Sequence, residues 1–176
     1  IASLKPDAVF AFFAGGGAPK LIKDWKAAGL KGKIALCGPG FLTEGILDEV
    51  GDAAEGMETT LHYGDGIETP KNKTFRLNYA KAFKMQPDVY AVQGYDAGLL
   101  LAAGLKVVKG DVSKKKQLIA ALEKAEIDSP RGKWKMSKDH NPIQDMYLRK
   151  VVGKENKVMS IAIKAFDYPA RGCKMG

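Results

Sequence analysis

A glycine-rich turn is the first feature of the sequence with the chemistry of a binding site. Gly15-Gly16-Gly17 follows the apolar run Ala8–Phe13 and precedes an amphipathic segment, which is where dinucleotide-binding folds place their phosphate turn. The dinucleotide fingerprint also needs a glycine at position 20 and an acid after the next strand, where the sequence has Lys20 and Cys37-Gly38-Pro39-Gly40. Both tests of that fingerprint fail. Two interpretations stay open: N–H groups that hold a ligand oxygen, or a tight turn and nothing more.

The segment Pro87–Asp96 is the second cluster of potential ligand contacts. Near the predicted start of a helix it gathers two tyrosines, an amide and a carboxylate: Tyr90, Gln93, Tyr95 and Asp96. A tyrosine offers an apolar wall and one polar tip, which suits a cleft for a small ligand. The alternatives are structural. Tyr95 packs in the core, and Asp96 is a first-turn carboxylate stabilised by the helix dipole.

Catalysis and metal binding find little support in the residue types. Cys37 is a potential nucleophile with His62 or His140 as its base, but no pattern orders the three as a triad. A cysteine after an apolar strand is usually a small buried hydrophobe. Two histidines without cysteine or carboxylate neighbours at ligand spacing predict no metal site. Cys37 and Cys173 form one possible disulfide, which nothing in the sequence favours. We expect a protein that is not an enzyme and has no cofactor.

The overall composition is that of a folded domain rather than of a nucleic-acid-binding protein. Hydrophobic residues make up 45% and charged residues 27% of the 176 residues, which excludes a disordered chain. The formal charge of +8 comes from 28 basic and 20 acidic residues, but the lysines are spread along the polar sides of amphipathic segments. Because nucleic-acid footprints concentrate on one surface, we expect no nucleic-acid partner. No apolar run reaches the ~20 residues that span a bilayer.

The elements around the glycine turn alternate between strand and helix. The predicted strands are 8–13, 33–37 and 56–63, and the predicted helices between them are 18–30 and 42–50. The first two strands are apolar on both faces, as in a buried parallel sheet. Connections this short require parallel strands with right-handed crossovers. The first 63 residues are therefore predicted to be an α/β unit, with the glycine turn beyond the carboxyl end of its first strand.

The second half of the chain follows a different pattern. Helices are predicted at 72–84, 89–108 and 113–126, the last with Ser113 as its N-cap. Strands are predicted at 134–136, 146–152 and 158–165, with Gly153–Asn156 as a hairpin loop. The three helices have no predicted sheet of their own to cover, and the chain opens as if inside the last turn of a helix. Both observations predict a piece of a longer protein.

Four motifs, taken in order, resemble one known family. They are Lys5–Phe10 continuing through Gly29-Leu30, then Gly51–Gly56, Gly94–Ala97 and Ser129–Gly132. Each motif is weak alone, but together they run essentially from end to end of the chain. They resemble the type 1 periplasmic solute-binding proteins, and more closely the branched-chain amino acid receptor group of ABC importers. Members of that family are much longer than this chain.

The resemblance implies an α/β fold that is half of a two-lobed type 1 periplasmic-binding-protein fold with parallel-sheet lobes. It implies that residues 1–63 are the βαβαβ part of the second lobe. Residues 64–138 resemble a helical part that returns to the first lobe, and residues 139–176 resemble crossover strands back to the second lobe. A first-lobe sheet outside this sequence would then cover the predicted helices.

The resemblance also places a small ligand in a cleft between the lobes. The implied ligand-binding residues are Phe13, Ala14, Gly15, Gly16, Gly40, Phe41, Tyr90, Tyr95 and Asp96. In amino acid receptors of the family, a glutamate in the second ligand-facing loop meets the ligand's ammonium group, whereas Gly38–Phe41 has no acid here. An ammonium buried without a counter-charge is costly. We therefore expect an aromatic or aliphatic carboxylate in preference to a branched-chain-type amino acid.

The function implied by the resemblance is reversible binding and delivery. We expect the substrate-binding component of an ABC importer, located in the periplasm, whose partners are a small-molecule ligand and a membrane permease. Two alternatives share the fold class: a nucleotide-using doubly wound enzyme, and a sensory ligand-binding module of the same fold. Nucleotide that co-purifies with the protein would indicate the enzyme, and a fused output domain would indicate the sensor.

Overall fold

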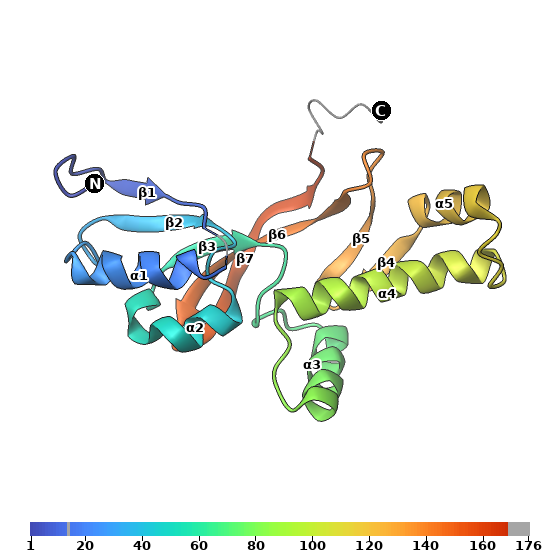
Figure 1. Ribbon diagram of the computed structural model, residues 1–176, viewed down its shortest axis with the longest axis horizontal. Helices are drawn as coiled ribbons and strands as arrows, with labels where there is room; N and C mark the ends of the chain where they lie inside the picture. Colours follow the sequence, from blue (N-terminus) through green and yellow to red (C-terminus); the bar gives the residue numbers. More distant parts are fainter. Residues whose placement is uncertain (14, 169–176) are drawn as a thin grey trace. The chain divides into compact units, whose positions relative to one another are not determined.

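The computed structural model describes residues 1–13 and 15–168, so Ala14 and Cys173 lie outside the described residues. The chain forms two compact units. Among the described residues, unit 1 comprises 1–67 and 147–162, and unit 2 comprises 68–146 and 163–168. Figure 1 follows the chain through its helices and strands in sequence order.

Unit 1 is built on three parallel strands, as the sequence predicts. They are β1 (Ala8–Phe10), β2 (Ala35–Pro39) and β3 (Glu58–Leu61). The chain crosses between them through α1 (Gly17–Ala27), then α2 (Glu44–Val50) and the short 3-10 helix η1 (Gly51–Ala54). Successive right-handed crossovers that step in one direction place their helices on one face of a sheet, and α1 and α2 lie on the same side of the strands in Figure 1.

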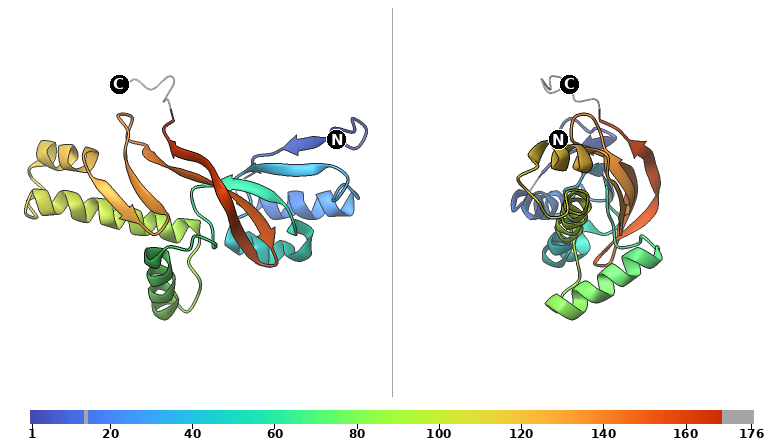
Figure 2. Two further views of the ribbon diagram at one scale, coloured as in Figure 1. Left: turned by 180° about the vertical axis from the view of Figure 1, so that it is seen from behind. Right: turned by 90° about the vertical axis from the view of Figure 1, so that its right-hand side faces the viewer.

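Two later strands complete the sheet of unit 1. The strand β6 (Pro142–Val152) runs antiparallel to β3, with Glu58 opposite Lys150. The strand β7 (Glu155–Phe166) pairs with β6, and Figure 2 shows the two as long neighbouring strands. The turn Gly153-Lys154 joins them, and Gly153 has a left-handed φ of 63°. The predicted hairpin is thus confirmed, with a shorter loop than expected.

The core of unit 1 lies between this sheet and its helices. Ile22 and Trp25 of α1 face it, and Leu47 comes from α2. From the sheet side, Leu36 and Val151 pack against the same cluster. These residues are at most 5% exposed, so this unit has a hydrophobic core of its own.

The described part of unit 2 contains three helices, of which the first two begin with side-chain caps. α3 (Pro70–Phe83) begins after Thr69, whose hydroxyl accepts the N–H of Asn72 at 3.1 Å. α4 (Val89–Val107) begins after Asp88, whose carboxylate accepts the N–H of Ala91 at 2.8 Å. Such contacts satisfy N–H groups that the first turn leaves unpaired. Both helices lie where the sequence predicts them.

The third helix is shorter than predicted. α5 spans Lys115–Glu123, and its N-cap is Lys114 rather than Ser113. The Ser113 hydroxyl donates instead to the carboxylate of Asp111 at 2.6 Å. The prediction of Ser113 as the cap is therefore wrong, because a local side-chain hydrogen bond competes for its hydroxyl.

A small antiparallel sheet accompanies these helices, against the expectation that the chain supplies none. It consists of β4 (Glu126–Ser129), β5 (Gly132–Met136) and the first residues of β6. In the β4–β5 hairpin Ile127 lies opposite Trp134, and both side chains are buried. α4 packs against β4, and α5 packs against β5. The expected helix thus ends before the strand β4, which the sequence interpretation missed.

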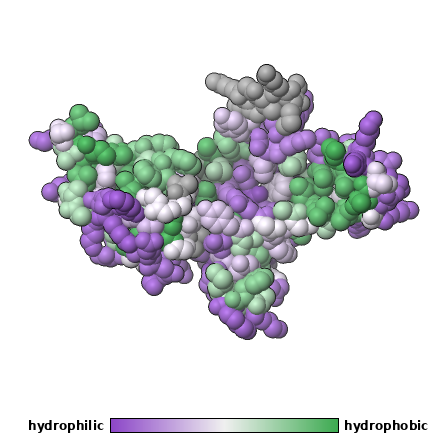
Figure 3. All heavy atoms as spheres, in the orientation of Figure 1, coloured by the Kyte–Doolittle hydropathy of each residue, from purple (hydrophilic) through white to green (hydrophobic). Residues whose placement is uncertain are grey.

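Apolar side chains are also exposed on both units. On unit 1, Phe10 and Phe12 are 75% and 71% exposed, and Figure 3 shows hydrophobic surface over β1 and β2. On unit 2, exposed apolar residues lie on α4 and α5, namely Leu101, Val107 and Ile119. No helix within residues 1–13 and 15–168 is long and apolar enough to cross a membrane.

Candidate functional site

The carboxyl ends of the parallel strands in unit 1 define the candidate site. Because β1, β2 and β3 are parallel, the segments that follow them leave from one edge of the sheet. These segments are residues 11–16, 40–43 and 62–67. Open α/β sheets bind their ligands in the crevice outside this edge. The candidate site therefore consists first of the residues that these three segments place at the carboxyl-terminal edge of the sheet.

The first two segments approach each other so closely that one position requires glycine. The N–H of Ala11 donates to the carbonyl of Cys37 at 2.8 Å. A Cβ at Gly38 would lie 1.8 Å from the Ala11 carbonyl oxygen, where no side chain fits. Gly40 follows with a left-handed φ of 60°, and its N–H donates to the Thr60 carbonyl at 3.1 Å. Close backbone contacts between these segments thus hold this edge of the sheet together.

The glycine turn lies in the segment after β1. Gly15 and Gly16 are exposed, and Phe13 is 42% exposed. Gly15 has a left-handed φ of 58°, and its carbonyl accepts the N–H of Ala18 at 3.2 Å. α1 begins at Gly17 with no side-chain hydrogen bond at its N-cap. Because the Ala18 N–H is already bonded and Pro19 has none, the donors available to an anionic group such as a carboxylate are those of the glycine turn itself, aided by the dipole of the helix start.

Phe41 occupies the core rather than the edge. Its side chain has 0% exposure and belongs to the hydrophobic cluster of unit 1, as does the neighbouring Leu42. The structure therefore gives Phe41 a packing role, and its ring has no surface to offer a ligand in this conformation. Gly40 is half-buried at the start of the same segment.

The two tyrosines of α4 in unit 2 are exposed but do not share a helix face. Tyr90 is 61% exposed and Tyr95 is 43% exposed. They are five positions apart in sequence, which turns their side chains ~140° apart around the helix axis. Tyr90 and Tyr95 form one cluster in the sequence, but their side chains project from different sides of α4.

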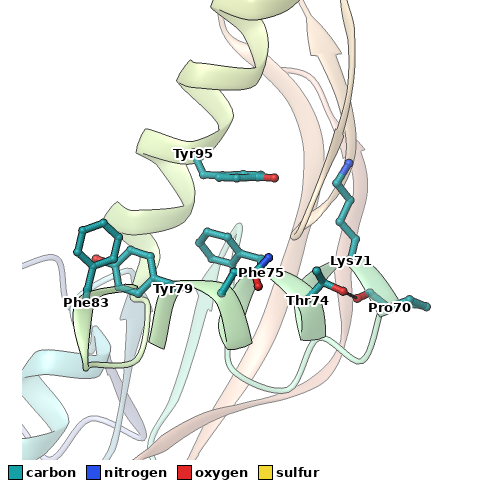
Figure 4. Close-up of a pocket in the computed structure, with 8 residues that line it drawn as sticks. Pro70, Lys71, Thr74, Phe75, Tyr79, Phe83 and Tyr95 are labelled. Atoms are coloured by element: carbon teal, nitrogen blue, oxygen red, sulfur yellow. Dashed lines mark hydrogen bonds between the residues drawn. The ribbon is translucent and has the colours of Figure 1, made fainter. Parts of the chain in front are cut away.

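Tyr95 belongs to an aromatic groove between α3 and α4. Its ring lies 4.9 Å from that of Phe75, which lies 5.9 Å from Tyr79, and Tyr79 lies 4.6 Å from Phe83. Figure 4 shows Tyr95 facing α3, with the other rings following one another along that helix. The groove has a volume of about 470 Å³ and is also lined by Pro70, Lys71, Thr74 and Asn78. The four-residue spacing of Phe75, Tyr79 and Phe83 is that of residues on one helix face, whereas nothing in the sequence places Tyr95 beside them.

Asp96 is buried in an ion pair. It is 3% exposed, and its carboxylate accepts the Nε–H of Arg131 at 2.5 Å and the indole N–H of Trp134 at 3.0 Å. The Arg131 guanidinium also lies 5.4 Å from the centroid of the Trp134 ring, a cation–π contact. Asp96 therefore fastens α4 to the β4–β5 hairpin. It lies in the third turn of the helix, beyond the reach of the N-terminal dipole.

The potential nucleophile Cys37 and one of its potential bases, His140, each contact another group within their own unit. The half-buried Cys37 points its thiol toward the Val9 carbonyl, with 3.7 Å between sulfur and oxygen. His140 lies in unit 2, where its Nε2 is 2.9 Å from a carboxylate oxygen of Glu123. His62 is buried in unit 1. In the part of the chain that the structure describes, no three or more His, Cys, Asp or Glu side chains gather as a potential metal site.

Solved structures of other proteins share this fold. The chain is 50% identical to a solute-binding protein of an R. palustris ABC transporter, solved in complex with benzoate, with a TM-score of 0.91 over 98% of this chain and 48% of that one. It is 32% identical to a Rhodopseudomonas palustris BisB5 solute-binding protein in complex with 3,4-dihydroxybenzoic acid, with a TM-score of 0.85 over 96% of this chain and 48% of that one.

A third similarity shows the fold alone. A leucine-binding protein from Thermotoga maritima is 17% identical, with a TM-score of 0.76 over 91% of this chain and 45% of that one. The chain thus spans about half the length of these structures. No curated protein sequence matches it.

A family profile described as periplasmic binding protein matches residues 1–156. That match covers the parallel strands, the glycine turn and the β4–β5 hairpin alike. The resemblance carried by the four sequence motifs is confirmed by it, and so is the α/β half of a two-lobed type 1 fold. The chain belongs to the periplasmic binding protein family.

Proposed function

We propose that this chain is part of the substrate-binding component of an ABC importer, and that the ligand is a benzoate-type aromatic carboxylate. The component is periplasmic, binds its ligand reversibly and delivers it to a membrane permease without changing it covalently. The observation that carries this proposal is the 50% identity, over 98% of the chain, to a solute-binding protein with benzoate bound. Unit 1 corresponds to the second lobe of the receptor, and unit 2 to the returning part of the first.

The chemistry of the unit 1 edge supports a carboxylate. The turn Gly15–Gly17 provides N–H groups for a carboxylate oxygen at the start of α1, where the helix dipole also favours a negative charge. Phe12 and Phe13 expose apolar surface on the same segment, which suits an aromatic ring. Gly38–Phe41 adds no carboxylate, so this segment offers no counter-charge to the ammonium of an amino acid.

The tyrosines of α4 remain predictions as ligand contacts. Tyr90 is the better placed, because it is 61% exposed and its ring is not part of the aromatic groove. Tyr95 has part of its surface against Phe75. The buried Asp96 acts on the ligand only through the position of α4.

Calorimetry on the full-length protein tests the proposal. Benzoate is expected to bind and leucine is not. Phe13→Ala is expected to weaken benzoate binding ~10- to 100-fold, since fully burying such a ring contributes ~1.5–3 kcal/mol. Leu77→Ala is the matched control, because Leu77 is an exposed apolar residue of α3 outside the aromatic groove. The benzoate affinity of the Leu77→Ala variant should equal that of the wild type.

Two outcomes would contradict these assignments. Binding of leucine without binding of benzoate would refute the aromatic carboxylate. Unchanged benzoate affinity in Tyr90→Ala would remove Tyr90 from the site, while leaving the ligand class intact.

A further inference from the structure

A buried polar network holds the segment that follows β2. Its centre is the carbonyl of Leu42, which accepts a hydrogen bond from an Arg149 terminal nitrogen at 3.1 Å and another from the Asn156 side-chain amide at 3.0 Å. We propose that Arg149 and Asn156 are positioning residues that fix residues 40–43 in the geometry that binds ligand. This inference rests on the function proposed above.

Both donors reach Leu42 from far along the chain. Arg149 lies on β6, 107 residues away in sequence, and Asn156 lies on β7, 114 residues away. All three residues are within unit 1 and have 0% exposure. Neither α2 nor β2 supplies these bonds, so the segment between them depends on strands that return to unit 1 late in the chain.

The burial makes these bonds hard to replace. Residues 41–43 are buried, so water cannot take over the role of a lost donor without entering the core. A buried carbonyl left without its partner carries a desolvation penalty. The guanidinium of Arg149 is likewise removed from water, and in this arrangement its two terminal nitrogens donate to carbonyl and hydroxyl oxygens. The network therefore selects one position of the segment over others.

The same two residues also hold β3 and the segment after it. Arg149 donates to the Tyr63 carbonyl at 3.1 Å and to the Thr59 hydroxyl at 2.9 Å. The backbone N–H of Asn156 donates to the Asp65 carboxylate at 3.0 Å. Two of the three segments at the candidate site are thus fastened to one buried pair of residues.

Close backbone packing reinforces this attachment. A Cβ at Gly64 would lie 2.9 Å from a methyl carbon of Val158, and a Cβ at Gly66 would lie 2.8 Å from the Val158 backbone nitrogen. The segment after β3 therefore packs closely against β7. A segment that is already rigid loses less conformational entropy when ligand binds than a flexible one would. The network therefore raises affinity by preorganisation.

Asn156→Ala and Arg149→Lys in the full-length protein test the role of the network. Asn156→Ala leaves Arg149 intact, and Arg149→Lys keeps a positive charge and a donor, so both are milder than truncation of Arg149 to alanine, which risks unfolding. Each variant is expected to weaken benzoate binding, measured by calorimetry, about tenfold, equivalent to 1.4 kcal/mol of lost preorganisation. Hydrogen exchange without ligand is expected to be faster at the amides of Gly40 and Ile46, which are bonded to Thr60 and Thr43.

Val151→Ala is the matched control. Val151 is a fully buried core residue on β6, two positions from Arg149. The variant should lower thermal stability, yet change benzoate affinity by less than about twofold, because it removes no hydrogen bond from the segment.

Wild-type affinity in both network variants would overturn the proposal, and so would an equal loss of affinity in Val151→Ala. If the wild-type protein does not bind benzoate, the proposed ligand fails. The exchange rates at Gly40 and Ile46 still decide the positioning role in that case, since unchanged rates in both network variants refute it.

Discussion

Replacing Arg131 with methionine is expected to destabilise the protein strongly. The Arg131 and Asp96 side chains are 5% and 4% exposed and lie 2.5 Å apart. The methionine variant leaves the Asp96 carboxylate buried without its cation. Removing one partner of a buried ion pair typically costs ~3–5 kcal/mol, because the remaining charge stays desolvated.

A more exposed ion pair, which joins α3 to the same hairpin, provides the control. Lys71 lies 2.9 Å from Asp128 of β4, and the side chains of this pair are 36% and 65% exposed. Solvent screens such pairs, and their contribution is typically ~0–1 kcal/mol. Lys71→Met therefore removes an ion pair of similar length without leaving a buried charge.

Urea denaturation of the full-length protein, followed by circular dichroism, measures both variants. Hydrogen exchange at the amides of Ile127 and Trp134 reports on the hairpin itself, because these residues face each other across β4 and β5. The double variant Asp96→Leu/Arg131→Met is expected to be more stable than Arg131→Met alone, since it leaves no unpaired charge. Equal destabilisation by Arg131→Met and Lys71→Met would refute the reasoning, and so would a double variant that is less stable than the single one.

Two further predictions concern the edge of the sheet and the surface of unit 1. Gly38→Ala should abolish folding of unit 1 or cost at least ~4 kcal/mol by urea denaturation, because its Cβ would lie 1.8 Å from the Ala11 carbonyl oxygen; a variant with wild-type stability would contradict the close approach. The hydrogen bond and charge of Lys26 lower the pKa of Asp52. The ion pair between Asp52 and Lys26 therefore contributes to stability above the unfolded-state pKa of Asp52, and this contribution is lost as pH falls through the folded-state pKa. Lys26→Met should raise the pKa of Asp52 toward its ordinary value in an NMR titration, and an unchanged titration would contradict this cause.

The elements that sequence could predict are those whose pattern is local. The parallel strands of unit 1 and helices α3 and α4 follow from apolar runs and from caps such as Asp88. The strand β4 could not be found in this way, because it has four residues and follows α5 almost directly. Its identity as a strand comes from pairing with β5, where Ile127 meets Trp134. That pairing is a tertiary interaction, which local propensity does not encode.

The candidate site shows the same division between local and tertiary information. The exposed glycine turn was predictable, because its residues need no distant partner to remain at the surface. The burial of Phe41 and Asp96 was not, since it depends on a core cluster and on Arg131, 35 residues away in sequence. The role of Arg149 gave no sequence signal at all, because an arginine inside a strand pattern looks like a solvent-exposed residue.

The motifs that reveal the family build the scaffold, and this explains why they identify the family more readily than the ligand. Gly94–Ala97 and Ser129–Gly132 meet in the ion pair of Asp96 with Arg131, at the turn of the β4–β5 hairpin. Gly51–Gly56 contains η1, with Ala53 and Ala54 buried against α1 and α2. None of these contacts requires a particular ligand. For the function proposed above, we expect specificity to involve exposed residues on the loops that this scaffold holds, as is general for folds that host many functions. A change of ligand within the family is therefore expected to alter positions such as Phe13 while Asp96, Arg131 and Gly38 stay the same.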